Sequence, residues 1–359
     1  INNATQTGTS QLGGAMTPNP YFGGNSAGIV LFEVTGSGQS NLNGYTEMFG
    51  QSADFILANP NGLYINGAGF INTTGVTLVT GKPTVNGGYI DSFEISGGHI
   101  DVDQFIYANG SDYVDLISKS MRLSGTIIVG DELNLIAGEG SVDHQSKSVS
   151  NGGKVSTQVA IDASQLGAMV AGRISIISSD KGAGVHIEGD MIAQADDIVI
   201  NTNGDLYYDT IYANRDVLIN ATGAIEHTNY ISATGNINVQ SDETILIKGN
   251  GLAGADVTLN ATNGIVLDGQ LVSSTNVFIL AKELSLSSES TTTINQASIY
   301  SDDILLTVDG DIVSLESTVF ATKLDIQAQD VSLNETIFNA QKISVTANNI
   351  ETNSSQLLA

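Results

Sequence analysis

Short runs of alternating apolar and polar residues dominate this chain, and in its second half they recur at a nearly constant spacing. Each copy has a polar residue, an apolar one, any residue, a second apolar one and then usually Asn, Gln or Thr. The steps between successive copies are 19, 20, 20, 20, 27, 20 and 19 residues, which predicts a repeat with one insertion. The copies begin at Asp197, Asp216, Asn236, Asp256, Asn276, Asp303, Lys323 and Lys342.

The alternation within each copy is the period of a β-strand, and no copy carries the apolar stripe of an amphipathic helix. A second, weaker strand pattern precedes each copy, for example at Ile211–Ala213 and Tyr230–Ala233. Leucine-rich repeats need a framework of leucines and asparagines that this repeat lacks. Propeller blades have a period of about 40 residues or more, twice the period seen here. We therefore expect an all-β fold, a right-handed parallel β-helix with about 20 residues per rung, whose alternate Val, Ile and Leu form one interior column.

The first half of the chain is less regular. Segments 131–136 and 173–177 look like rungs, whereas 141–157 is rich in Ser, Lys and Gly and predicts a loop or a small hairpin outside the helix. This excursion is a candidate boundary. We expect one domain over residues 1–155 and a β-helical shaft over 156–359.

The composition narrows the classes of partner. Forty glycines in 359 residues exceed the usual ~7% and fit many short strands separated by turns. The net charge of −26 repels phosphate backbones, so nucleic acid is not an expected partner. The chain has no cysteine, which excludes disulfides and thiolate chemistry, and no spacing matches a known calcium or zinc loop. We predict no metal site and no cofactor.

One stretch is more specific than strand sequence. Phe49-Gly50-Gln51-Ser52-Ala53-Asp54-Phe55-Ile56-Leu57-Ala58-Asn59-Pro60-Asn61-Gly62-Leu63 and the continuation Gly67 to Pro83 resemble the secretion domain of two-partner-secretion exoproteins. This family includes filamentous-haemagglutinin-like adhesins and contact-dependent growth-inhibition toxins. Residues 160–174 and 182–187 are similar to the haemagglutinin repeats that follow that domain.

The chain departs from the family pattern at three places. The cysteine pair of many members corresponds to Ile65 and Ala68 here. A second family motif, Asn-Pro-Asn-Leu, aligns with Thr17–Pro20 and keeps only its middle residues. The chain also begins inside the family's domain, so its first strands are expected to be missing.

The resemblance implies export in an extended state through an outer-membrane transporter of the two-partner-secretion type, followed by folding outside the cell. It implies a secreted or cell-surface protein whose secretion motif is Asn59, Pro60, Asn61, Gly62 and Leu63. From the residues alone, Asn-Pro and Asn-Gly predict a tight turn at the same place. We expect both interpretations to hold together.

A surface patch for a ligand is the other candidate site. Tyr207, Tyr208, Tyr212 and Tyr230 fall in neighbouring copies of the repeat and could stack against a sugar, with ordinary packing between rungs as the alternative. A cell-surface glycan or protein, from host or bacterium, is the partner that such a patch implies.

Nothing predicts an enzyme. The four histidines lie far apart, and neighbouring carboxylates such as Asp196-Asp197 and Asp302-Asp303 point to opposite sides of a strand. We therefore predict no catalytic residues. Three functions compete: an adhesin with a fibrous shaft, the shaft of a contact-dependent growth-inhibition toxin and, as a minor alternative, a β-helical polysaccharide-active enzyme. A haem- or haemopexin-capturing protein is a variant of the binding class.

Overall fold

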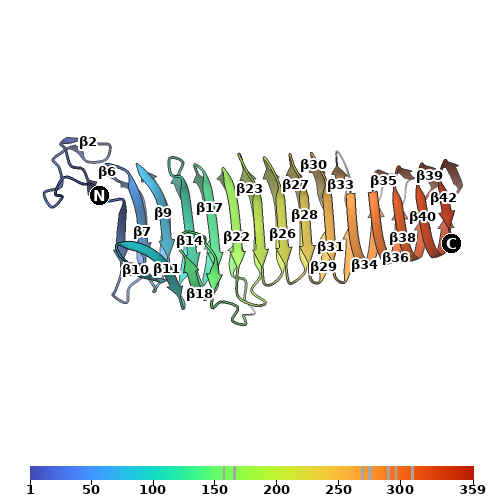
Figure 1. Cartoon of the computed structure of the whole chain (residues 1–359), viewed down its shortest axis with the longest axis horizontal. Helices are drawn as coiled ribbons and strands as arrows, with labels where there is room; N and C mark the ends of the chain where they lie inside the picture. Colours follow the sequence, from blue (N-terminus) through green and yellow to red (C-terminus); the bar gives the residue numbers. More distant parts are fainter. Residues whose placement is uncertain are drawn as a thin grey trace. The chain divides into compact units, whose positions relative to one another are not determined.

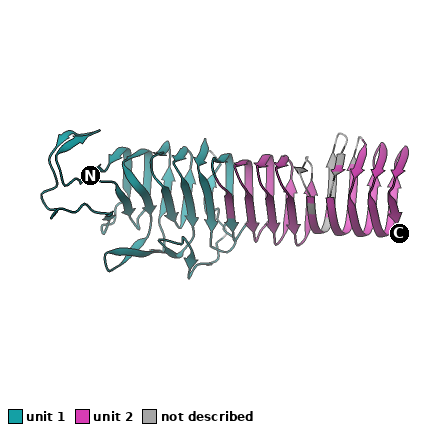
Figure 2. Cartoon of the chain, turned by 45° about the horizontal axis from the view of Figure 1, so that its top comes forward, with its two compact units in different colours: residues 1–195, 201–204 teal, residues 196–200, 205–359 magenta. Residues whose placement is uncertain are grey.

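The computed structural model describes residues 1–156, 158–164, 167–267, 271–273, 277–288, 292–295, 297–308 and 311–359. The elements assigned in these ranges are all β-strands. They fall into two compact units, the first formed by residues 1–195 and 201–204 and the second by residues 196–200 and 205–359 (Figure 2). The predicted all-β class and parallel β-helix are confirmed.

The strands of the first unit are short, as the alternation predicts. They are β1 (Asn2–Asn3), β2 (Gly8–Ser10), β3 (Gly14–Met16), β4 (Ile29–Glu33), β5 (Ser40–Glu47), β6 (Phe49–Gly50), β7 (Ala53–Ala58), β8 (Leu63–Ile71), β9 (Thr73–Val79), β10 (Lys82–Asn86), β11 (Tyr89–Ile95), β12 (His99–Val102), β13 (Phe105–Ala108), β14 (Tyr113–Ser118), β15 (Ser120–Leu123), β16 (Thr126–Val129), β17 (Glu132–Ala137), β18 (Gly140–Asp143), β19 (Val149–Ser150), β20 (Ile161–Ala163), β21 (Ala168–Ala171), β22 (Arg173–Ser178) and β23 (Val185–Ala193).

The second unit continues the same style of strand, and β24 (Ile198–Thr202) has residues in both units. Its strands are β25 (Leu206–Ala213), β26 (Val217–Ala221), β27 (Ile225–Ala233), β28 (Ile237–Ser241), β29 (Thr244–Ile247), β30 (Asn250–Ala253), β31 (Val257–Ala261), β32 (Gly264–Leu267), β33 (Leu271–Ser273), β34 (Val277–Ser288), β35 (Thr292–Asn295), β36 (Ala297–Val308), β37 (Ile312–Leu315), β38 (Thr318–Gln327), β39 (Asp330–Asn334), β40 (Ile337–Thr346), β41 (Asn349–Asn353) and β42 (Gln356–Leu358).

Parallel ladders between successive rungs build the first unit. On one ladder Ile100 of β12 pairs with Met121 of β15, which pairs with Ile161 of β20 and then Val185 of β23. These side chains point inward and are almost completely buried. Because each rung covers the apolar edge of the one before it, the column stabilises the unit only when rungs stack in register.

Two hairpins of the first unit leave the helix and form a sheet of their own. The antiparallel order is β10–β11–β18–β19, and Figure 1 shows β10, β11 and β18 outside the stack of parallel strands. The sheet packs Phe93 and Val142 against outward-facing Ile56, Ile117 and Ile136, so one face of the helix is covered. The hairpin β18–β19 confirms the predicted excursion at 141–157.

The N-terminal segment is tied to the helix by a buried carboxylate. Glu47 of β5 accepts hydrogen bonds from Ser10 Oγ at 2.6 Å and from the backbone amides of Gln11 and Leu12 at 2.8 Å each. The hairpin β2–β3 is thereby anchored to β5, although its own strands have only three residues each.

The polar residue that opens each copy of the repeat has a visible role in the second unit. The backbone amide of Asp216 donates to Asp197 Oδ1 at 2.9 Å, and that of Asn236 donates to Asp216 Oδ1 at 2.6 Å. Asp256 continues the series by donating to Asn236 Oδ1 at 3.2 Å. Each Asp or Asn therefore satisfies an amide at the corner of the next rung, which an apolar residue could not do.

The predicted insertion between Asn276 and Asp303 is wrong. Val277 pairs with Ala297, and Glu283 pairs with Asp303, so the rung step stays at 20 residues. The copies that begin at Asp303, Lys323 and Lys342 lie on a different ladder of the rung from those before Asn276. Two strands of one rung carry the same apolar alternation. The 27-residue step therefore measures the distance between copies on two different ladders, not an insertion.

Candidate functional site

The segment Asn59–Leu63 is a turn between β7 and β8, as predicted, and a polar side chain is buried at its first residue. Asn59 is completely buried. Its Nδ2 donates to Gly38 O at 2.9 Å and to Ser40 Oγ at 2.8 Å, while its Oδ1 accepts the backbone amide of Asn61 at 3.0 Å. Asn59 therefore fixes the turn to the segment that leads into β5.

The second asparagine binds the same segment from the surface. Asn61 is exposed, yet its Nδ2 donates to Gly36 O at 2.7 Å and to Asn59 Oδ1 at 2.9 Å. The amide of Gly62 closes the turn on Asn59 O at 3.1 Å. The φ angle of Gly62 is 115°, a region that L side chains rarely adopt. The residue types of the motif therefore follow from the geometry of the turn.

Within the motif, buried and exposed groups are separated. Asn59, Gly62 and Leu63 are buried, whereas Pro60 and Asn61 face solvent. Gly98, in the connection between β11 and β12, packs on the turn, because a Cβ there would lie 2.8 Å from Pro60 O. A partner of the folded turn can reach Pro60 and Asn61 only.

The second family motif forms a smaller turn of the same type. Asn19 donates from Nδ2 to Asn2 O at 3.0 Å, and its Oδ1 accepts the amide of Tyr21 at 3.0 Å. Ile65 and Ala68, at the family's cysteine positions, are both buried on β8. Ile65 and Ala68 therefore pack in the core at the positions where many family members have a cysteine pair.

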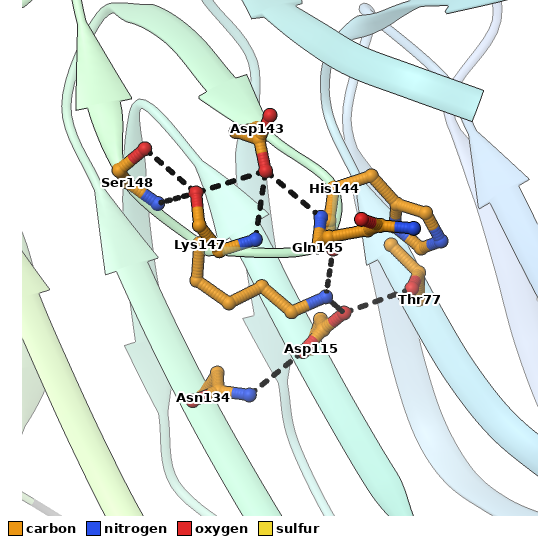
Figure 3. A network of polar contacts seen from close by, with 9 residues as sticks. Thr77, Asp115, Asn134, Asp143, His144, Gln145, Lys147 and Ser148 are labelled. Carbon is orange, nitrogen blue, oxygen red and sulfur yellow. Dashed lines mark hydrogen bonds and ion pairs between the residues drawn. The ribbon is translucent and has the colours of Figure 1, made fainter.

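A buried polar network beneath β18 and β19 was not found from the sequence. Asp115 of β14 is completely buried, and its carboxylate accepts Thr77 Oγ1 at 3.0 Å and Asn134 Nδ2 at 2.9 Å (Figure 3). Lys147, in the loop between β18 and β19, reaches the same carboxylate with Nζ at 2.6 Å. The network fastens the extra-helical hairpin to the helix, and both carboxylate oxygens of Asp115 have partners within it.

The loop of Lys147 has its own internal bonds. Asp143 Oδ1 accepts the amides of Gln145 and Ser146 at 3.0 and 2.7 Å, and Lys147 has a φ angle of 59°. Burial, and then the charge of Lys147, lowers the pKa of His144. Because Asp115 and Lys147 lie 32 residues apart, no local pattern pointed to the pair.

The four tyrosines predicted as a ligand patch do not lie together. Tyr208 is completely buried and stacks on His227 with ring centroids 4.8 Å apart, so it cannot be part of a surface patch. Tyr212 and Tyr230 do meet, at 5.6 Å and an interplanar angle of 42°. Tyr207 pairs in register with Glu226 on another part of the rung. The structure brings together only the pair Tyr212 and Tyr230.

Of the carboxylates considered for catalysis, Asp196 and Asp197 have structural partners. Asp196 pairs with Arg215 at 2.8 Å, while Asp197 accepts a backbone amide. Over the described residues, no group of three or more His, Cys, Asp or Glu side chains is arranged to hold a metal ion. Within the same ranges, no helix is long and apolar enough to cross a membrane.

Comparison with known proteins gives a consistent result. Residues 1–208 match the family model described as TPS secretion domain. The chain is 32% identical over 371 residues to a tRNA nuclease CdiA of Yersinia mollaretii, covering 98% of this chain and 12% of that protein. It is 30% identical over 251 residues to filamentous hemagglutinin of Bordetella pertussis, covering 67% of this chain and 7% of that protein.

A solved structure agrees with these sequence relatives. The crystal structure of the filamentous hemagglutinin secretion domain superposes with a TM-score of 0.59 at 28% identity. The match covers 72% of this chain and 84% of that one. The chain therefore matches most of a solved secretion domain but spans only a small part of the long sequence relatives.

Proposed function

The chain belongs to the family of TPS secretion domains, and from this premise we propose that the turn Asn59–Leu63 is the part that its outer-membrane transporter requires. The protein is a secreted, surface-associated exoprotein that directs its own passage through a two-partner-secretion transporter. The family is not one of enzymes. The observation that carries the proposal is the buried Asn59, whose Nδ2 binds the segment that leads into β5 and whose Oδ1 accepts an amide within the turn.

Two routes could make the turn essential for export. The transporter could bind the motif directly while the chain is extended, in which case Asn59 and Asn61 matter equally. Alternatively, folding outside the cell could draw the chain through, because a stacked solenoid can grow rung by rung from its first formed turn. In that case buried Asn59 matters more than exposed Asn61.

Secretion assays separate these routes. The exoprotein is produced with its cognate transporter, and the amount in the medium is compared for the wild type, Asn59→Ala and Asn61→Ala. Asn86→Ala, at the exposed tip of β10–β11, is the matched control. Equal loss for both motif variants supports direct recognition, and a larger loss for Asn59→Ala supports coupling to folding. Normal secretion of both variants would overturn the proposal.

The role after export is the finer question. An adhesin would bind a cell-surface glycan or protein, whereas a contact-dependent growth-inhibition toxin would use this region as the base of a shaft. The names of the relatives include both kinds, filamentous hemagglutinin and tRNA nuclease CdiA. We propose a shaft and surface role common to both. Deleting the region beyond Ala359 from the full gene, followed by adhesion and competition assays, distinguishes them.

A further inference from the structure

One face of the first unit carries an apolar stripe that the extra-helical sheet does not cover. The ladder runs from Tyr45 of β5 through Gly69 of β8 to Tyr107 of β13. It continues through outward-facing residues of β16, β21 and β23. We define the apolar stripe as Tyr45, Phe105, Tyr107, Ile128, Val170 and Ile192.

Two aromatic rings of the stripe lie flat on the backbone. A Cβ atom on Gly69 would lie 2.1 Å from Cε1 of Tyr45, so the ring occupies the space that a side chain would need. A Cβ on Gly67 would lie 2.8 Å from Cε1 of Phe105. Only glycine allows this close approach. The two glycines of β8 therefore let the rings lie against the sheet.

The outer surface of these rings is open to solvent. Tyr45 is 52% exposed and Tyr107, its neighbour across Gly69, is 41% exposed. Asn43, two residues before Tyr45, and Asn109, two residues after Tyr107, are exposed amides close to the rings in sequence. Aromatic surfaces bordered by amide donors and acceptors suit a ligand that has one apolar face and many hydroxyls.

The charge of the protein around the stripe limits the charge that a ligand can carry. No residue of the apolar stripe is charged, although the chain has a net charge of −26. On the neighbouring ladder, Thr126 of β16 and Ala168 of β21 are uncharged, whereas β23 contributes the exposed carboxylates Glu188 and Asp190 beside the stripe. The acidic surroundings repel polyanions such as sulfated glycans. The ligand that fits is neutral.

The size of the stripe disfavours a second copy of the chain or another folded protein. Six rungs at about 4.8 Å make a strip on the order of 25 Å long and about one or two side chains wide. A stable protein interface needs about 800 Å² from each partner, several times this area. A narrow strip whose groups recur at every rung matches an extended polymer better than a protein surface.

We propose that the apolar stripe binds a neutral, linear polysaccharide, with the apolar faces of its pyranose rings on Tyr45 and Tyr107. Successive sugars lie along the ladder over Ile128 and Val170, and the amides of Asn43 and Asn109 bind hydroxyl groups. This site differs from the turn at Asn59 and from the pair Tyr212 and Tyr230. It goes beyond the proposed export role and does not depend on it.

Calorimetric titration of the purified, secreted protein tests the site. The probes are neutral hexasaccharides of β-linked glucose and of β-linked mannose, with a heparin hexasaccharide as the anionic counterpart. We expect weak binding of a neutral probe that falls about tenfold or more in Tyr45→Ala and in Tyr107→Ala, as loss of a stacked ring implies. Heparin should not bind.

Tyr89→Ala is the matched control, because Tyr89 is 71% exposed at the tip of β10–β11 and lies off the stripe. It should bind as the wild type does, and circular dichroism should show that all three variants are folded. Absence of binding to both neutral probes at millimolar concentration would overturn the site. So would unchanged affinity in both stripe variants, or a preference for heparin. Because the titration uses protein already outside the cell, its failure leaves the export proposal intact.

Discussion

Several polar side chains in this protein form hydrogen bonds with backbone groups that would otherwise stay unpaired. Asn59 satisfies two backbone groups, Gly38 O and the amide of Asn61, and also binds Ser40 Oγ, which explains why a small polar residue is buried at a turn of an apolar helix. The Asp and Asn residues at the corners of the second unit follow the same rule.

Replacing Asn59 with Ala should therefore lower the free energy of unfolding of the secretion domain by about 2–3 kcal/mol, because three hydrogen bonds of this buried side chain are lost at about 1 kcal/mol each. Asn61→Ala should cost less than about 1 kcal/mol, since water can replace its exposed bonds. Urea unfolding of purified protein, followed by circular dichroism, measures both. Equal costs would contradict the assignment of Asn59 as the buried anchor.

His227 makes stability depend on pH. It is completely buried and stacks on Tyr208. Burial lowers the pKa of His227, and this effect outweighs the backbone of Asn250, the charge of Asp209 and the backbone of Tyr208, which all raise it. Below the unfolded pKa of about 6.5 the unfolded chain binds a proton that the folded chain excludes, so His227 destabilises the fold as pH falls.

His227→Leu should remove this part of the pH dependence. We expect the variant to gain more stability over the wild type at pH ~5 than at pH ~8, because only the wild type loses stability to protonation of the unfolded chain. Thermal unfolding at both pH values is the measurement. A gain that is the same at both would show that protonation of His227 does not oppose folding.

At the scale of elements, the sheet β10–β11–β18–β19 is held by two different means. Its apolar side packs on Ile56, Ile117 and Ile136. Beside that contact, Lys147 forms an ion pair with a carboxylate that is completely buried. Removing one partner of such a pair leaves an uncompensated buried charge.

Lys147→Met should therefore destabilise the hairpin by about 3–5 kcal/mol, and the double variant Asp115→Asn, Lys147→Met should be milder. Hydrogen exchange should accelerate first at the amides of β18 and β19. The control is Lys82→Met, at the start of β10, where the side chain is exposed. Unchanged exchange in the single variant would mean that apolar packing alone holds the hairpin.

At the scale of the whole molecule, the first unit matches a domain that exists as a solved structure. The family model ends at residue 208, and the compact unit ends at residue 204. A fragment of residues 1–208 should therefore fold alone, with a cooperative transition and a β-type circular dichroism spectrum. A fragment that remains unfolded, or gains structure only with residues 209–359 attached, would contradict this expectation.

The sequence by itself determined the fold class and the turn. Inward residues such as Ile100, Met121 and Ile161 alternate with outward ones, and strand stacking then leaves few architectures with this period. Asn59 to Gly62 also specify their turn locally, because Asn-Pro and Asn-Gly restrict the backbone over only four residues. Local pattern and local structure agree wherever the contacts are close in sequence.

Only the tertiary structure decided which outward faces are covered and which ladder each strand joins. Alternation is the same in every strand of a rung, so it could not show that Asp303 pairs with Glu283 and that no insertion exists. The alternation also could not predict that Lys147 contacts Asp115 or that Tyr45 packs on Gly69. It could not predict that Tyr208 is buried. These contacts join residues on different rungs or hairpins, and stacking, not local preference, sets their register.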